Sequence, residues 1–336
     1  MGRAYEECSI GDGTVERVQR NSYALAALAV AAVPGLVPQQ TTTLTAPLEG
    51  LECAGVVGED GRRVIVTAPV TAAAGAALEQ DLHVSESLLG TSLRAVVPPV
   101  LGSVKLPDGG RACVTAAPDG IPLTLDAVSA DSALARSLGG VIARIHAVPR
   151  YAAEATGAET FSADVLREGH RQRCQRAHEA ELLPTAVAQR WEHLLEDDEL
   201  WNHSSQFVHG DLSEDALFFD GDRVRAVRDW SSAHVGDPAQ DLAWLITGLD
   251  SDSFDAVYAG YRQELPTVPH PRLMERAQAL GEFAVLSWLL HGVDAEDEEI
   301  IADAQGMLAD LDNDLAQLAR EQAERTFDDM DVNPSW

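Results

Sequence analysis

The chain has very little positive charge. Among its 336 residues, lysine and arginine together number 24 against 54 aspartates and glutamates, which gives a formal net charge of −30 at pH 7, and Lys105 is the single lysine. Binding to nucleic acid needs lysine and arginine side chains that displace counterions from the phosphates, so this composition argues against a nucleic-acid partner. The negative charge would suit a cationic small molecule. A generally acidic surface that confers solubility is the simpler interpretation.

Cysteine is also scarce, and the apolar runs are short. The chain has four cysteines, which are Cys8, Cys53, Cys113 and Cys174. Their wide spacing matches no zinc motif and gives no sign of a disulfide framework, so a reducing cytoplasm is the expected compartment. The apolar run at 23–33 ends at Pro34 and is well short of the about 20 residues that cross a bilayer. We therefore predict a helix over 21–33 and no membrane partner.

The first third of the chain lacks a glycine-rich phosphate loop of the protein-kinase type, because Gly50 and Gly55 are too sparse to form one. It is instead rich in threonine and valine and interrupted by turn residues such as those at 59–61, which is typical of strands. The predicted strands are 41–47, 52–57, 63–68, 96–100 and 111–115, and a helix is predicted over 71–89. Together these elements predict a small antiparallel sheet with helices.

The chain does contain the carboxylates that phosphoryl transfer requires. One carboxylate must orient the attacking hydroxyl, and others must hold Mg²⁺ against the nucleotide phosphates. Asp211 follows His209 in a His-Gly-Asp sequence, a hairpin is predicted over 218–227, and Asp229 stands just after it. We expect both carboxylates to reach one cleft. A lone His-Gly-Asp would be a weak signal, and the Asp-Gly turn inside the hairpin would by itself indicate only a turn.

A third motif makes the combination far more specific. The sequence Gly-Asp-Pro-Ala-Gln-Asp-Leu-Ala occupies 236–243. The three segments resemble the aminoglycoside and macrolide phosphotransferase family, whose pattern is roughly His-Gly-Asp-x-x-x-x-Asn, then hydrophobic-Asp-Trp, then Gly-Asp-Pro-x-x-Asp-Leu-Ala. The resemblance is strongest over 205–247 and extends in weaker form across nearly the whole chain.

This resemblance implies an α+β, bilobal, protein-kinase-like fold. A small N-lobe with an antiparallel sheet plus helices would span 1–117, and a larger, mostly helical C-lobe would span 118–320. In the second lobe, the helical spacing of apolar residues predicts helices around 134–145, 273–288 and 300–318, and further helices are expected at 163–180, 185–196 and from Leu242. The acidic segment 321–336 lacks such periodicity, so we expect it to be disordered.

The resemblance also implies roles for individual residues. Asp211 would orient and deprotonate the substrate hydroxyl, His209 would hold the loop through hydrogen bonds, and Asp229 would bind Mg²⁺. ATP or GTP would be the phosphate donor, and the backbone at Ala116 and Ala117, in the hinge, would meet the edge of the adenine. The partners would be this nucleotide and a small hydroxylated substrate, whose identity the sequence leaves open between antibiotic, sugar, amino alcohol and other metabolite.

Three further residues of these motifs have expected structural roles. Asp241 is placed to cap the helix that begins at Leu242 and to brace the catalytic loop. Trp230 and Trp244 are expected in the hydrophobic core rather than at a binding surface.

Two positions depart from the family pattern. Ala216 stands where the family has a metal-binding Asn or His, and Thr67 stands where it has a Lys or Arg that contacts the nucleotide phosphates. Without that cation, neither Glu79 nor Asp81 can form the ion pair that the family makes with a helix carboxylate. A solvent-exposed helix face is expected for both carboxylates.

These departures leave two functions open. The first is Mg²⁺-dependent transfer of the nucleotide γ-phosphate to a hydroxyl of a small molecule, such as a macrolide, an aminoglycoside or a metabolite. The second is a pseudokinase-like binding or scaffold protein with a protein partner. The presence of both Asp211 and Asp229 favours the enzyme, because a fold without catalysis has little chemical need of both. A hydrolase that uses His209, Asp211 and Ser213 is disfavoured, because these residues are too close in sequence for an ordinary triad and no Gly-x-Ser-x-Gly is present.

Overall fold

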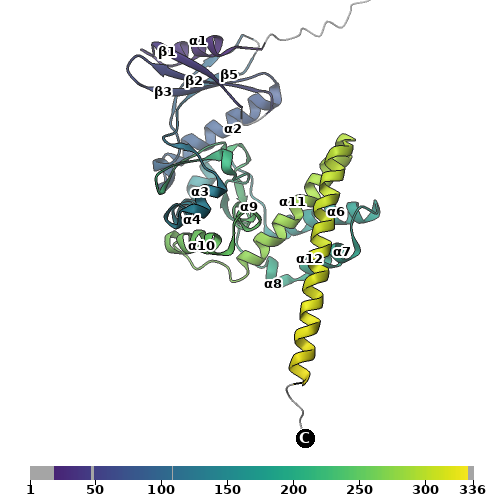
Figure 1. The fold of residues 1–336 in the computed structure, drawn as a ribbon. Helices are drawn as coiled ribbons and strands as arrows, with labels where there is room; N and C mark the ends of the chain where they lie inside the picture. The colour runs from purple at the N-terminus through teal and green to yellow at the C-terminus, as the bar shows by residue number, and fades with distance from the viewer. Residues whose placement is uncertain (1–18, 47–48, 108, 332–336) are drawn as a thin grey trace, which may run out of the picture. The chain divides into compact units, whose positions relative to one another are not determined.

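The computed structural model describes residues 19–46, 49–107 and 109–331, and for 322–331 it describes the backbone only. Contacts divide the chain into two compact units (Figure 1). The first unit comprises 1–75 and 101–117, and the second comprises 76–100 and 118–336. The first is organised around a sheet and the second is mostly helical, so the predicted α+β, two-lobed architecture is confirmed.

The first unit is built on an antiparallel sheet of five strands in the order β1-β2-β3-β5-β4. These strands are β1 (Pro38–Leu44), β2 (Leu51–Gly58), β3 (Arg63–Pro69), β4 (Val100–Lys105) and β5 (Arg111–Ala116). Helix α1 (Ser22–Ala32) begins where the Asn21 side chain accepts a hydrogen bond from Ala24 N, and its buried Leu25 and Ala29 pack on the sheet. The predicted helix at 21–33 and the strands predicted at 52–57 and 63–68 are therefore confirmed, whereas the strand predicted over 41–47 runs from Pro38 to Leu44, and residue 47 lies outside the described residues.

The strand predicted over 96–100 is wrong. Its Val-Val-Pro-Pro sequence follows a short 3-10 helix, η1 (Ser92–Ala95), and strand β4 begins only at Val100. The two prolines carry no N–H for a ladder, and Val96 and Val97 are instead buried in the core of the second unit. There Val96 O accepts a hydrogen bond from Val227 N at 2.8 Å.

The second unit holds most of the helices, and the helices predicted by periodicity are confirmed. Their bounds are α2 (Ala72–Leu88, which begins in the first unit), α3 (Leu125–Ala130), α4 (Ser132–His146), α5 (Arg150–Ala155), α6 (Ala163–Glu179), α7 (Thr185–Glu196), α8 (Asp198–Trp201), α9 (Gln240–Gly248), α10 (Ser251–Glu264), α11 (Leu273–Ala295) and α12 (Glu298–Asp331). One buried cluster packs α4, α9 and α10 together, and a second packs α7, α11 and the start of α12.

Helices α4 and α10 approach each other very closely at two glycines. A Cβ on Gly139 would lie 1.8 Å from Val257 O, and a Cβ on Gly260 would lie 2.1 Å from Arg136 O. Only glycine therefore permits this backbone contact. Helix α4 of this pair contacts β7 and β9, two strands next to the candidate site.

Short strands connect these helices to the candidate site. Strand β6 (Ile121–Pro122) pairs with β8 (Leu217–Asp220), which forms the predicted hairpin with β9 (Arg223–Val227). A second, two-stranded sheet pairs β7 (Gln206–Val208) with β10 (His234–Gly236). The chain thus enters and leaves the His-Gly-Asp segment through paired strands.

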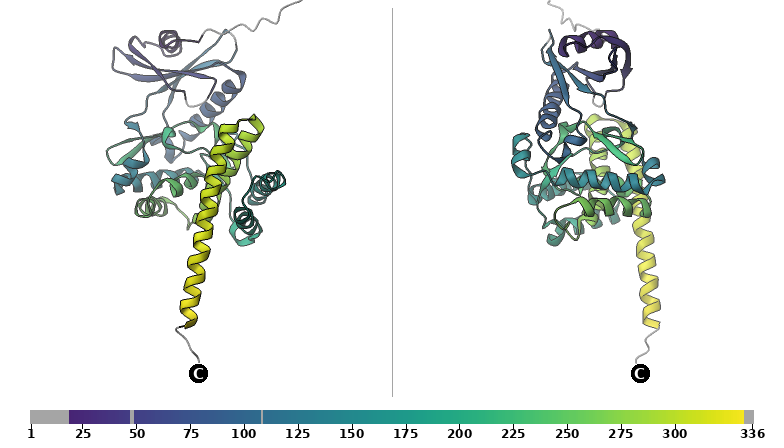
Figure 2. Two further views of the ribbon diagram at one scale, coloured as in Figure 1. Left: turned by 45° about the vertical axis from the view of Figure 1, so that its right-hand side comes forward. Right: turned by 90° about the vertical axis from the view of Figure 1, so that its left-hand side faces the viewer.

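Helix α12 is longer than the sequence suggests. It packs along α11 and α7 and then continues past them (Figures 1 and 2). The segment 321–336 was expected to be disordered, but its described part, 321–331, is helical, and 332–336 lies outside the described residues. No glycine or proline occurs between Gly306 and Asp331 to end the helix. Within the described ranges, no helix is both long enough and apolar enough to cross a membrane.

Candidate active site

The His-Gly-Asp loop is held by one buried carboxylate. Asp241, in the first turn of α9, accepts hydrogen bonds from His209 N at 2.9 Å and Gly210 N at 3.0 Å. Burial alone would raise the pKa of Asp241, but hydrogen bonds from His146 and His209 hold it below its usual range. The carboxylate braces the loop as expected. It does not cap the helix, because the N-cap is Ala239.

Two further features fix the loop in place. The His209 ring donates its Nε2–H to Arg228 O at 2.8 Å and packs on Trp230 with ring centroids 4.7 Å apart. Gly210 has a φ of 85°, and a Cβ there would lie 2.3 Å from Ser232 O. His209 therefore links the loop to the backbone beside Asp229, which is a positioning contact.

Asp211 and Asp229 are brought near each other. The Asp211 side chain is exposed at the end of the loop, whereas Asp229 is partly buried and has a left-handed backbone with φ of 66°. Burial raises the pKa of Asp229, and the negative charges of Asp211 and Asp215 raise it further. A strained aspartate beside other carboxylates is typical of a functional site.

Asp81 joins this segment from another part of the chain. Its carboxylate accepts a hydrogen bond from Trp230 N at 2.7 Å, so the expectation of a solvated Asp81 is wrong. Burial raises the pKa of Asp81 to about 6. The contact links α2 to the backbone just after Asp229, across 149 residues of sequence.

The donor set around Asp229 fits one metal ion. Mg²⁺ in phosphotransferases is held by one or two carboxylates together with substrate phosphates and water, and Asp229 meets that requirement. Ala216 is buried and has no ligand atom. Nearby Glu214 is occupied, since its Oε1 accepts a hydrogen bond from Leu125 N. In the part of the chain that the structure describes, no three His, Cys, Asp or Glu side chains are grouped to hold a metal by themselves.

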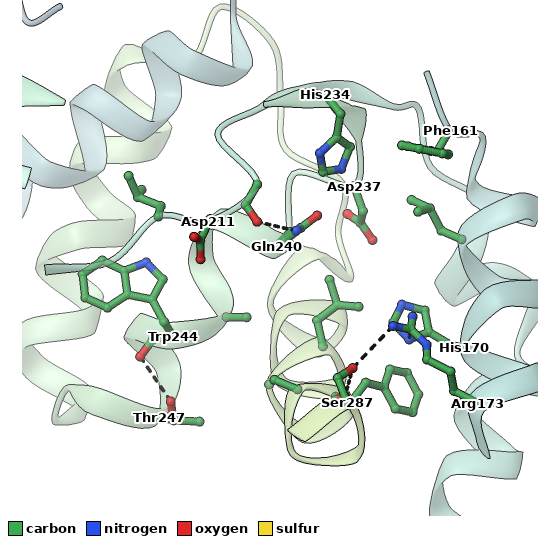
Figure 3. A pocket seen from close by; sticks show the side chains of 18 of the residues that line it. Phe161, His170, Arg173, Asp211, His234, Asp237, Gln240, Trp244, Thr247 and Ser287 are labelled. Atoms are coloured by element: carbon green, nitrogen blue, oxygen red, sulfur yellow. Dashed lines mark hydrogen bonds between the residues drawn. The ribbon is translucent and has the colours of Figure 1, made fainter. Parts of the chain in front are cut away.

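Asp211 lies on the rim of a large pocket of about 650 Å³ within the second unit (Figure 3). The pocket is formed by the loop, α6, α8, α9 and α11. Its larger apolar lining residues are Phe161, Leu166, Trp201, Leu212, Trp244, Leu280 and Phe283. Trp244 packs against the core cluster, as expected, but it is only partly buried and also lines this pocket.

The pocket has few charged groups. Asp237 is buried and bound by Arg276 at 2.9 Å, and Arg173 is its one lining arginine. Gln240 Nε2 donates to Gly210 O at 2.7 Å, which ties the floor of the pocket to the loop (Figure 3). Asp211 is therefore the one lining carboxylate that no arginine occupies. The pocket can accept a bulky, largely apolar molecule and present a hydroxyl to Asp211.

His170 is kept neutral in this pocket. Its ring stacks on Phe283 with centroids 4.6 Å apart, and its Nδ1 accepts a hydrogen bond from Arg173 Nη2 at 3.0 Å. Burial, then the Arg173 charge, lowers the pKa of His170 to about 3, although Asp237 opposes the shift. At neutral pH the ring thus adds no positive charge to the pocket.

This shift predicts a pH-dependent stability. Because the folded pKa of His170 lies below the unfolded value, the native state is favoured above pH 6.5 and loses this advantage as pH falls. As the pH falls from 7.5 to 5, protonation of His170 in the unfolded state should lower the free energy of unfolding by about 1 kcal/mol, after discounting for partial exposure. Urea denaturation of His170→Gln should show a flatter pH dependence. The exposed His178, on the same helix, provides the control, and His178→Gln should leave the slope unchanged.

The remaining predicted residues lie in the first unit. Ala116 ends β5, and Ala117 N donates to Arg63 O at 3.0 Å. Thr67 lies in the middle of β3, opposite Cys53 and Cys113, and its hydroxyl is 3.5 Å from Cys53 Sγ. Its short side chain brings no positive charge to this strand.

The site combines a loop aspartate, braced by a buried carboxylate, with a second aspartate just after a hairpin. Together with a sheet unit followed by a helical unit, this is the arrangement of a protein-kinase-like phosphotransferase. Residues 56–280 match the model of the phosphotransferase enzyme family. Because the match covers more than half of the chain, the chain belongs to this family, the aminoglycoside and macrolide phosphotransferases.

Three individual proteins show different degrees of similarity to this chain. The crystal structure of macrolide 2'-phosphotransferase MphH from Brachybacterium faecium is 25% identical with a TM-score of 0.73, and the match covers 86% of this chain and 98% of that one. The GDP and kanamycin complex of APH(2")-IIia is 18% identical with a TM-score of 0.67, over 85% of this chain and 97% of that one, and shares the fold. A match to the uncharacterized protein YcbJ of Bacillus subtilis (strain 168), 28% identical over 108 residues, covers 32% of this chain and only 35% of that protein's length.

Proposed function

We propose that this protein transfers the γ-phosphate of ATP or GTP to a hydroxyl of a bulky, largely apolar small molecule, with a macrolide as the model substrate. The observation that carries this proposal is the position of Asp211 on the rim of the apolar pocket. A hydroxyl presented from that pocket would meet a carboxylate that can orient it and accept its proton.

Each residue has a part in the proposed reaction. Asp211 orients and deprotonates the hydroxyl, and His209 keeps the loop in position through Arg228 O. Asp229 would hold one Mg²⁺, which would neutralise charge on the nucleotide phosphates when bound. The backbone at Ala116 and Ala117 is proposed to meet the nucleotide base.

The charge of the pocket favours an apolar substrate over a polycation. An aminoglycoside carries several ammonium groups, and binding them out of water requires several paired carboxylates. Here Asp237 is already paired with Arg276, and Arg173 adds a positive charge. Asp211 is therefore the one lining carboxylate that could pair with a cationic substrate. The 25% identity to a macrolide 2'-phosphotransferase points in the same direction.

A scaffold without catalysis remains the alternative, and Thr67 and Ala216 are the observations that favour it. Ala216 has no metal-ligand atom, and Thr67 has no positive charge with which to pair with phosphates. In that case the protein would bind a protein partner and transfer no phosphate. Phosphate transfer is therefore the experiment that separates the two functions.

The test is a transfer assay with radiolabelled ATP and GTP against a macrolide and against kanamycin. We expect labelled macrolide and little labelled kanamycin. Mass spectrometry of the product should show one added phosphate. Transfer to neither compound, nor to a panel of apolar alcohols, would support the scaffold instead.

Trp244→Ala tests the pocket. Removing this indole takes away apolar contact area, so we expect the KM for the apolar substrate to rise about tenfold while kcat changes little. Trp288→Ala is the control, because Trp288 is exposed on α11 and lies outside the pocket lining. An equal rise in KM for both variants would argue against this pocket as the substrate site.

A further inference from the structure

The proposed nucleotide site is short of positive charge. Phosphoryl transfer places a polyphosphate beside carboxylates, and its charge must be neutralised by metal ions and cationic side chains. In the second unit, the negative charges of Asp211 and Asp215 act on Asp229, so several carboxylates gather at this point. Ala216 removes one metal ligand, and Glu214 is bound to Leu125 N and does not replace it.

Arg228 is the cation beside this cluster. Its Nη2 lies 3.7 Å from Asp229 Oδ1, and its side chain is 21% exposed, so it is neither solvated nor fully buried. The guanidinium carbon lies 5.8 Å from the centre of the Phe218 ring, which holds the group in place. Its positive charge acts on Asp229, opposing the effects of burial and of the neighbouring carboxylates.

Arg228 and Ala216 are direct neighbours across the hairpin. Arg228 N donates to Ala216 O at 2.9 Å, one residue beyond the paired Leu217 and Val227. The small side chain at Ala216 thus stands next to the arginine. Ala216, which lacks a metal ligand, and Arg228, which carries a cation, are therefore hydrogen-bonded neighbours just beyond the end of the β8–β9 pairing.

We propose that Arg228 binds the nucleotide phosphates and supplies, as a fixed cation, the positive charge that a second metal ion would bring. The protein would then use one Mg²⁺, at Asp229, together with one guanidinium. Arginine suits this role because its planar group is always charged and forms paired hydrogen bonds with phosphate oxygens. This inference rests on the proposed function, since it requires that a nucleotide binds.

The first measurement is nucleotide binding by calorimetry, with Mg²⁺ and with EDTA. The wild-type protein should retain measurable ATP or GTP binding in EDTA, because the guanidinium needs no metal. Arg228→Gln should weaken binding about 10- to 100-fold in EDTA, which is the effect of losing a hydrogen bond to a charged group. Arg228→Lys keeps the charge and should recover most of that loss.

The second measurement counts metal ions. Mn²⁺ in place of Mg²⁺ can be counted by electron paramagnetic resonance at saturating nucleotide. We expect one Mn²⁺ per bound nucleotide in the wild-type protein. The double variant Ala216→Asn/Arg228→Gln should bind two, because it restores a ligand and removes the competing charge.

Arg225→Gln is the matched control. Arg225 lies on β9, which ends one residue before Arg228, and its Nη2 is 3.7 Å from Asp220 Oδ2, the same separation as in the Arg228–Asp229 pair. Arg225→Gln removes the same charge three residues from Arg228 and should leave nucleotide affinity unchanged. The side chain of Arg228 forms no hydrogen bond in the described structure, whereas its backbone groups do, so Arg228→Gln should fold, as its melting temperature will report.

The outcomes separate this inference from the proposed function. The role of Arg228 would be overturned if the wild-type protein bound two Mn²⁺ with the nucleotide, or if Arg228→Gln and Arg225→Gln had equal affinities. Either result would leave the proposed phosphotransferase activity unaffected. Absence of nucleotide binding under every condition would overturn both. One Mn²⁺ together with a selective loss in Arg228→Gln would support the inference.

Discussion

Replacing Asp211 with asparagine should reduce phosphate transfer about 10²- to 10⁴-fold. The amide keeps the size of the side chain but cannot accept the proton of the substrate hydroxyl. The loop should keep its shape, because it is held by the hydrogen bonds from His209 N and Gly210 N to Asp241, and neither bond involves the Asp211 carboxylate. Single-turnover transfer with the preferred substrate is the measurement.

The reduction should appear in kcat and leave nucleotide affinity nearly unchanged, because Asp211 acts on the hydroxyl and Asp229 on the metal. Asp222→Asn is the control. Asp222 is an exposed carboxylate in the turn between β8 and β9 and lies outside the proposed site. If Asp211→Asn transfers phosphate as fast as the wild-type protein, Asp211 has no part in catalysis and the proposed mechanism is wrong.

Replacing Arg276 with methionine should lower the free energy of unfolding by about 3–5 kcal/mol, because it removes the guanidinium that pairs with a buried carboxylate. Arg276 is 1% exposed. Its Nε lies 2.9 Å from Asp237 Oδ2 and its Nη2 lies 3.3 Å from Oδ1, while Nη1 donates to Leu200 O at 3.1 Å. Urea denaturation at pH 7.5 measures the change.

The Asp237 carboxylate explains the size of this effect. Burial would raise its pKa, but His203 and Arg276 lower it to about 2. Its folded pKa is therefore below the unfolded value, so its stabilisation is present above about pH 4 and is lost as pH falls toward 2. Without Arg276 the ionised group would remain buried beside the pocket. Arg276→Met/Asp237→Asn should recover part of the loss, because it removes the unpaired charge.

Arg272→Met is the control for Arg276. Arg272 precedes the same helix and binds Asp197 and Glu275, but its side chain is 27% exposed. Ion pairs exposed to water contribute about 0–1 kcal/mol, so this change should cost far less. Equal costs for the two variants would mean that burial of the Asp237 pair does not determine its contribution.

The candidate site could be found from the sequence where its parts are local. The loop, the hairpin and the Gly-Asp-Pro segment all lie within 205–247, and the hairpin turn follows from an Asp-Gly pair. The bracing role of Asp241 followed from the same motif. Periodicity was enough for helices with a clear apolar face, such as α4 and α11, but α3, α5, α8 and α10 were not predicted.

Local patterns were insufficient where a residue's environment comes from distant segments. The valines at 96 and 97 looked like a strand, but they fill the core of the second unit. Asp81 looked solvated, but it caps Trp230 N from 149 residues away. The tryptophan at 244 gave no sign that it would line a pocket, because that pocket needs α6, α8 and α11 as well.

The sequence by itself determined the family, the α+β architecture and the two aspartates proposed for catalysis, because these depend on short motifs and on repeating apolar positions. The tertiary structure decided which charges meet. It brought Arg276 to Asp237, set Arg228 beside Asp229 and Ala216, and left Asp211 at the rim of an apolar pocket. These contacts depend on how distant helices and strands pack, and burial then fixes the electrostatic effect of each charge.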